Sequence, residues 1–173
     1  NTTKALDAYQ RMQAAAEARI AKAPGELDAE RDLSVSHNKI GDVSMAKGNL
    51  AGAQTAYEAA LSIGERLAAT DPANSGWQRD LSVSHVGIGD LRAARGNLAG
   101  ALTAYEAGLA ILERLAASDP NNSGWQRDLS VSYERIGSVM AAQDNPVDAL
   151  TAYAAGLAIV ERLAAADPGN SER

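Results

Sequence analysis

Apolar residues recur along this chain with the period of an α-helix. In the segment 76–95 the large side chains are spaced three or four positions apart, at Trp77, Leu81, His85 and Ile88. The segment 98–118 repeats this spacing at Ala101, Tyr105, Leu109, Leu112 and Leu115. No stretch shows the sustained two-residue alternation that is typical of a half-buried strand. We therefore predict an all-α protein without a β-sheet.

The pattern of the whole chain repeats every 48 residues. The phrase Arg-Asp-Leu-Ser-Val-Ser begins at Arg31, Arg79 and Arg127. Self-similarity at a fixed period is the signature of a solenoid, in which each unit buries its apolar face against its neighbours. We divide the 173 residues into a half repeat and three repeats, with the boundaries 1–27, 28–75, 76–123 and 124–173, and expect this single array to be an excerpt of a longer one.

Each repeat contains two segments of helical pattern, here called its first helix and its second helix. We predict seven antiparallel helices, at 3–23, 28–47, 50–70, 76–95, 98–118, 124–143 and 146–166. Ser75 is the expected N-cap of the helix 76–95, because Gln78 follows three residues later as in a capping box. Gly96 is expected to end that helix, since a residue at this position adopts a positive φ.

The third repeat changes the chemistry of the turn between its two helices. Asp144 stands where the earlier copies have Gly48 and Gly96. Asn145 is a favourable N-cap and Pro146 a favourable first helical residue, so we expect the last helix to start there.

Several of these residues form a pattern that resembles the tetratricopeptide repeat (TPR) family. The pattern comprises an apolar–Gly pair, a turn glycine, a small–aromatic–small series and a closing proline, here Ile88-Gly89, Gly96, Ala101, Tyr105, Gly108 and Pro120. The usual TPR period is about 34 residues, so each helix here is longer by about two turns. The resemblance implies an α-solenoid of antiparallel helix pairs, a TPR-like superhelix, whose first helices line a concave groove that binds a peptide or protein segment.

Composition narrows the possible chemistry. The net charge is −6 and the pI is near 4.9, which argues against nucleic acid as a partner because phosphate binding needs clustered Lys and Arg. There is no Cys, which excludes disulfides and thiolate ligands. We see no signal peptide and no uninterrupted apolar run of membrane-spanning length, so we expect no membrane partner and a cytoplasmic location.

One positive charge recurs in every copy of the phrase. The residues are Arg31, Arg79 and Arg127, and each has a glutamate on the preceding helix at a similar height, at Glu17, Glu65 and Glu113. One hypothesis is structural: each Arg pairs with that Glu across a helix junction. The other is functional: the arginines form a row on the concave face that meets an acidic partner.

Other positions on the first helices differ between copies. Those that the TPR resemblance places in the groove are Asn38, Val86, Glu134, Asp42, Asp90 and Met45. This variation could encode a ligand, or it could be drift on a solvated face. The Lys and Asn pattern with which some TPR modules hold a terminal carboxylate is missing from these positions, so that ligand is not expected.

We find no constellation of nucleophile, base and orienting group, and expect no enzyme activity, no metal and no cofactor. His37 and His85 lie one repeat apart, and Tyr133 replaces them in the third copy, which indicates a packing position. The leading hypothesis is a protein-binding scaffold. The alternative is a structural spacer or self-association segment of a larger signalling or effector protein. Weak self-association through exposed repeat ends is a further expectation.

Overall fold

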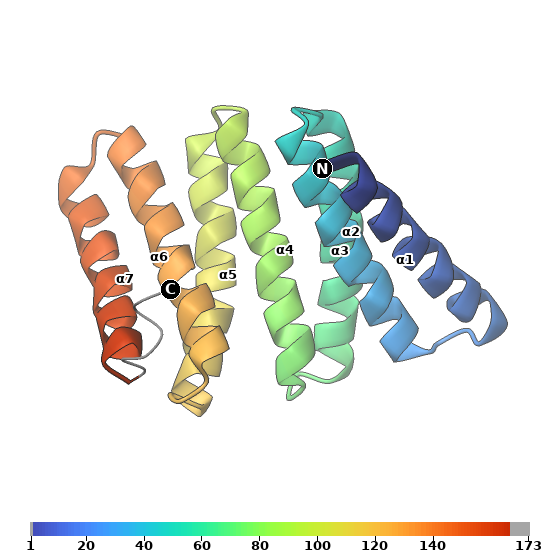
Figure 1. The fold of residues 1–173 in the computed structure, drawn as a ribbon. Coiled ribbons are helices and arrows are strands. Elements are labelled where there is room, and N and C mark those ends of the chain that lie inside the picture. Colours follow the sequence, from blue (N-terminus) through green and yellow to red (C-terminus); the bar gives the residue numbers. More distant parts are fainter. Residues whose placement is uncertain (1, 167–173) are drawn as a thin grey trace.

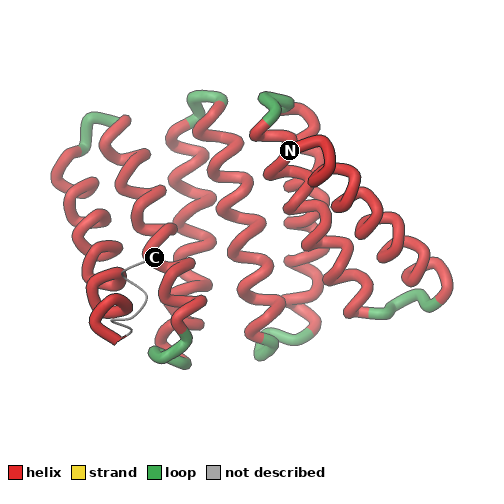
Figure 2. Tube along the Cα trace, in the orientation of Figure 1, coloured by secondary structure: helices red, strands yellow, loops and turns green. Residues whose placement is uncertain are grey.

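The chain folds into a single row of antiparallel helices. The structure is a computed structural model, and it describes residues 2–166. Within this range there are seven helices and no strand (Figures 1 and 2). Their bounds are α1 Thr2–Lys22, α2 Leu27–Ala46, α3 Leu50–Thr70, α4 Ser75–Ala94, α5 Leu98–Ser118, α6 Ser123–Ala142 and α7 Pro146–Ala166. The expected helices are thus all present.

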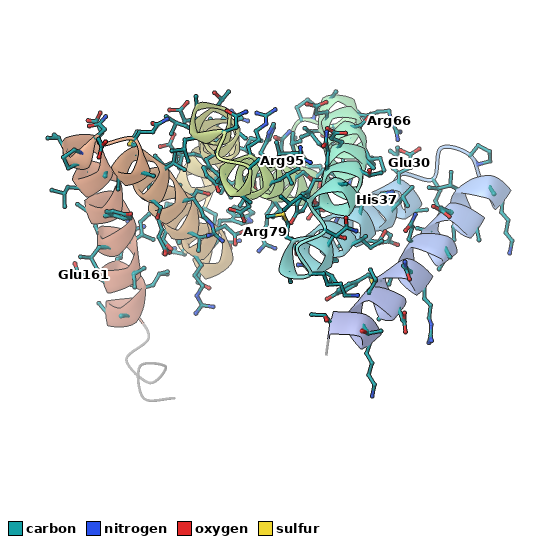
Figure 3. The ribbon with its side chains drawn as sticks, turned by 90° about the horizontal axis from the view of Figure 1, so that it is seen from above. Glu30, His37, Arg66, Arg79, Arg95 and Glu161 are labelled. Carbon is teal, nitrogen blue, oxygen red and sulfur yellow. The ribbon has the colours of Figure 1, made fainter. Side chains whose placement is uncertain are left out.

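Each helix packs against its neighbours in sequence, so the fold is an α-solenoid. The first helices α2, α4 and α6 also approach one another, which the second helices α3, α5 and α7 do not within the described residues. A row whose members touch on one side only must bend toward that side. Figure 3, seen from above, shows this bend, and the first helices line its inner face.

The apolar core repeats residue for residue. One buried cluster joins Ala53 and Tyr57 of α3 to Ile88 and Leu91 of α4 and to Ala104 of α5. A second cluster contains the residues 48 positions later, at Ala101, Tyr105, Ile136, Val139 and Ala152. Equivalent residues therefore solve the same packing problem at successive junctions, as expected for a repeat array.

The first helices α4 and α6 start one residue earlier than predicted because their N-cap is an asparagine. The Asn74 side-chain oxygen accepts a hydrogen bond from the Trp77 backbone N–H at 3.1 Å, and Ser75 is already helical. Asn122 caps α6 in the same way through Trp125. The prediction of Ser75 as the N-cap was therefore wrong. An Asn cap contributes about 1 kcal/mol to helix stability.

The turns between the paired helices follow the expected chemistry. Gly48 and Gly96 have φ values of 71° and 76°, and Asp144 takes the same left-handed conformation at 57°. Asn145 accepts a hydrogen bond from the Asp148 backbone N–H at 3.4 Å, and α7 starts at Pro146. The alternative turn of the third repeat is thus confirmed.

A polar contact joins the two helices of a pair near their far ends. Arg66 of α3 forms an ion pair with Glu30 of α2 (Figure 3), and Arg162 of α7 donates to Gln126 of α6 in the equivalent place. Glu30 and Gln126 are buried away from water, so the two arginines supply the polar partners that these side chains would otherwise lack.

Candidate functional site

The inner face carries two hollows between neighbouring first helices. The central hollow, of about 190 Å³, lies between α4 and α6 and is lined by Ser82, Val83, Val86, Leu112, Asp128, Val131 and Ser132. The terminal hollow, of about 440 Å³, lies at the C-terminal ends of the first helices and is lined by Met45, Asp90, Ala93, Leu98, Tyr105, Arg135, Ser138, Val139 and Ala142. Both are shallow and open to solvent, as a groove for an extended chain would be.

The arginines of the phrase form a ladder between successive first helices. Arg31 Nε donates to Asp80 Oδ2 and Arg79 Nε donates to Asp128 Oδ2, each over 2.6 Å. Each Arg therefore meets the Asp of the next copy of the phrase, 49 residues later. The hydrogen bond to its aspartate raises the pKa of both Arg31 and Arg79. Among residues 2–166 no carboxylate pairs with Arg127.

The predicted Arg–Glu pairs do not form in the described residues, and that partner assignment was wrong. Each glutamate instead lies next to an aromatic side chain of the following first helix, which is His37, His85 or Tyr133. Tyr133 Oη donates to Glu113 Oε1 at 2.8 Å. In the earlier copies Glu17 and Glu65 raise the pKa of His37 and His85, but burial of the imidazoles outweighs them and lowers both pKa values.

Two of the candidate residues anchor buried tyrosines. Tyr57 Oη donates to Asp42 Oδ1 at 2.9 Å, and Tyr105 Oη donates to Asp90 Oδ1 at 2.6 Å. Burial and the adjacent carboxylate both raise the pKa of these phenols, so they stay protonated and donate. Asp90 also forms an ion pair with Arg135, whose Nε lies 3.3 Å from Asp90 Oδ1 inside the terminal hollow.

The series Asn38, Val86 and Glu134 has a different setting in each copy. Asn38 is buried between α2 and α4, where its Nδ2 donates to Ser84 Oγ at 2.9 Å. Val86 is half-buried and lines the central hollow. Glu134 is exposed and lines a smaller notch of about 150 Å³ against α7. Asn38 therefore supports the contact of two first helices rather than opening onto the groove.

The structure brings together only part of the predicted site. Met45 and Asp90 share the terminal hollow, whereas Arg31, Asp42 and Glu134 line neither hollow. The valines of the phrase, Val83 and Val131, are exposed on the inner face but were not among the predicted site residues. Their signal was present, because Val83 lies four positions after Arg79 and three before Val86, on the same helical stripe.

The described residues contain no group of three or more His, Asp or Glu side chains placed to hold a metal ion. They do contain one helix, α7, that is long and apolar enough by composition to span a membrane. Only part of it is buried, on the side that packs against α6. Length and composition are weak evidence for a membrane span, because a core helix of a soluble protein passes the same test.

Comparison with known proteins supports the fold. No family model matches the chain, and no curated protein sequence does. A solved structure of similar fold is the crystal structure of BtubC (BKLC) from P. vanneervenii, with a TM-score of 0.68 and 16% sequence identity. The match covers 94% of this chain and 58% of the BtubC chain. At that identity the likeness establishes a shared arrangement of helices.

Proposed function

We propose that this chain is a TPR-like, non-enzymatic scaffold that binds an extended peptide or protein segment on its concave face. The observation that carries the proposal is the central hollow. The exposed side chains of Val83 and Val131 line it with apolar surface, and Asp128, which pairs with Arg79, also lines it. Apolar pockets with a few polar groups at the rim are typical of peptide grooves.

The groove also has a spacing that suits an extended ligand. Val83 and Val131 are equivalent residues of adjacent first helices, whose axes in packed pairs lie about 10 Å apart. A peptide in the extended polyproline II conformation has three residues per turn and rises about 3.1 Å per residue. Apolar side chains three residues apart therefore face the same side, about 9 Å from each other, and reach the two sites. The terminal hollow, with Asp90 and Arg135, supplies polar contacts further along the groove.

A peptide library displayed on phage tests this function, with the immobilised chain as bait. We expect selected peptides to bind with apolar anchors and to lose at least tenfold in affinity to the variant Val131→Asp. The matched control is Thr103→Asp, at an exposed position of the second helix α5. The proposed groove would be contradicted if no peptide is selected above background, or if the selected peptides lose affinity equally to both variants.

A second role, as a structural segment that joins repeat units end to end, is favoured by one observation. The apolar side chains Leu150, Leu157 and Val160 of the last helix are exposed. Sedimentation velocity over a concentration series tests this second role, in which copies of the chain associate through this surface.

A further inference from the structure

The last second helix exposes a face that its counterparts bury. Tyr57 and Tyr105 are 3% and 2% exposed, but the equivalent Tyr153 on α7 is 38% exposed. Leu112 is 1% exposed, and the equivalent Val160 is 50% exposed. The surface defined by Leu150, Tyr153, Leu157 and Val160 is here called the α7 face.

At the inner junctions this face is covered by the next first helix. Tyr57 packs against Gly87 of α4, and Gly64 approaches Leu81 of α4. One junction further on, Leu112 lies in the same buried cluster as Leu129 of α6. The covering residue is thus the leucine of the Arg-Asp-Leu-Ser phrase, which no described residue supplies to Val160.

Arg127 provides an independent observation at the same end of the row. Arg31 and Arg79 each hold the Asp of the next phrase helix at 2.6 Å, whereas Arg127 is exposed and pairs with no carboxylate within residues 2–166. Arg127 and the α7 face lie on consecutive helices of the same end of the row, so one incoming helix can reach both.

A third contact lies in the notch between α6 and α7. Glu134 lines this hollow of about 150 Å³ together with Tyr153, Leu157 and Val160. Glu134 stands one repeat after Val86 and two after Asn38, and Asn38 bonds to the second serine of the next phrase, Ser84. A carboxylate at this position can accept a hydrogen bond from a serine hydroxyl in the same place.

The opposite end of the row is built differently. Arg19 on α1 stands where α3 and α5 have the buried leucines Leu67 and Leu115. Its guanidinium pairs with Asp32 at 2.5 Å and also with Glu26. Asp32 therefore receives its arginine from α1, and the N-terminal end carries charge in the place of an apolar contact.

We propose that the α7 face, together with Arg127 and Glu134, is a docking surface for a helix that carries the phrase Asp-Leu-Ser-Val-Ser, supplied by a further repeat unit. The incoming Asp pairs with Arg127, the Leu packs on Leu157 and Val160, and the second Ser donates to Glu134. This goes beyond the binding of a peptide in the concave groove, because it concerns the end of the row and a helical partner.

An intact second copy of the described residues cannot supply that helix. Its phrase helices α2, α4 and α6 are each packed between the preceding and the following helix, and its end helices α1 and α7 lack the phrase. Two α7 faces could meet only by burying apolar side chains without the Arg–Asp pair. The charge at Arg127 therefore selects a phrase helix over a second copy.

Binding of a fluorescein-labelled peptide that covers residues 74–96 to the intact chain tests the proposal. Because an isolated helix of this length is marginally stable, a lactam-bridged form that is helical by circular dichroism serves as a second probe. We expect saturable binding that Val160→Asp weakens at least tenfold. The matched control, Thr151→Asp, should bind like the wild type, because Thr55 and Thr103 are exposed in the inner copies.

A double-mutant cycle then tests the ion pair. Arg127→Ala in the chain and Asp80→Asn in the peptide should each weaken binding by up to about fivefold, and the two together by no more than one alone. The proposal fails if the helical probe does not bind, if Val160→Asp has no effect, or if the two changes multiply independently. It also fails if the α7 face instead mediates dimerisation in sedimentation, or partition onto phosphatidylcholine–phosphatidylglycerol vesicles, and the probe does not compete.

Discussion

Arg79 on α4 donates from Nε to Asp128 Oδ2 on α6 over 2.6 Å, although the two residues are 49 positions apart. The contact joins first helices of successive repeats directly, across the inner face. Arg31 and Asp80 repeat it one unit earlier. The phrase that recurs in the sequence therefore carries both halves of one interface: its Arg serves the following helix and its Asp the preceding one.

The first prediction measures this pair. The side chains of Arg79 and Asp128 are 45% and 27% exposed, so we expect a coupling free energy of only about 0–1 kcal/mol. A double-mutant cycle of Arg79→Ala and Asp128→Asn, followed by urea denaturation, gives that value. Arg127→Ala is the control, and it should cost less than Arg79→Ala. Equal costs for the two arginines, with strictly additive losses, would contradict the ladder.

The second prediction concerns the close approach of Tyr57 to Gly87. A Cβ atom on Gly87 would lie 2.5 Å from Tyr57 Cε1, which the ring cannot avoid because Gly41 closes its other side. Gly87→Ala should therefore destabilise the fold by about 1–3 kcal/mol. Gly64→Ala is the matched control, because a Cβ atom on Gly64 would lie in ordinary contact with Leu81. This substitution should raise the stability of the helix by about 0.5–1 kcal/mol. Thermal unfolding compares the two, and a Gly87→Ala protein as stable as the control would refute the close packing.

The third prediction is a pH dependence. Burial lowers the pKa of His37 and His85 in the folded state, so the unfolded chain binds more protons below the ordinary value of 6.5. Their contribution to stability is complete above pH 6.5 and is lost as the pH falls toward the folded pKa. Urea midpoints measured between pH 7.5 and 5.5 should therefore decrease.

The third repeat provides the control for that measurement. Tyr133 occupies the histidine position and does not titrate in this range, because the ordinary pKa of a phenol is about 10 and burial raises that of Tyr133 further, to about 12. The double variant His37→Tyr and His85→Tyr should show a shallower decrease than the wild type. An unchanged slope would assign the pH dependence to other groups.

The fourth prediction concerns the left-handed residue of the third turn. Asp144 has a φ of 57°, a conformation that costs a residue with a Cβ atom more than it costs glycine. Asp144→Gly should raise the free energy of unfolding by about 0.5–1 kcal/mol. The reciprocal change Gly96→Asp should lower it by a similar amount. Differential scanning calorimetry of the two variants measures these changes in stability. A destabilised Asp144→Gly protein would contradict the prediction and show that the Asp side chain stabilises the turn.

Helix number, order and length follow from the sequence because each rests on local rules. Helical spacing of apolar residues, a positive-φ glycine at Gly96 and a proline at Pro146 all act within a few positions. The start of α4 was misplaced by one residue because Asn74 and Ser75 are both good caps, and the backbone conformation decides between them.

The inter-repeat contacts were harder to predict. Arg79 was assigned a partner on the preceding second helix, whereas its partner lies on the next first helix. Apolar periodicity indicates which face is buried but not which first helices touch. The side chains that allow this contact, Ser84 and Ser132, are small and fully buried, and Asn38 is buried with them. In the sequence a buried serine is indistinguishable from a solvated one.

The ladder also makes the length of the array adjustable. Removing residues 76–123 as a block would set Arg31 opposite Asp128 and Asn38 opposite Ser132, so the new junction would contain the same pairs as the old one. It would also offer a donor to Ser132 Oγ, which has no hydrogen-bond partner within the described residues. Recombination between copies of the phrase can thus shorten or lengthen the groove in steps of 48 residues without designing a new interface. Groove length is then a trait that can evolve separately from the stability of each junction.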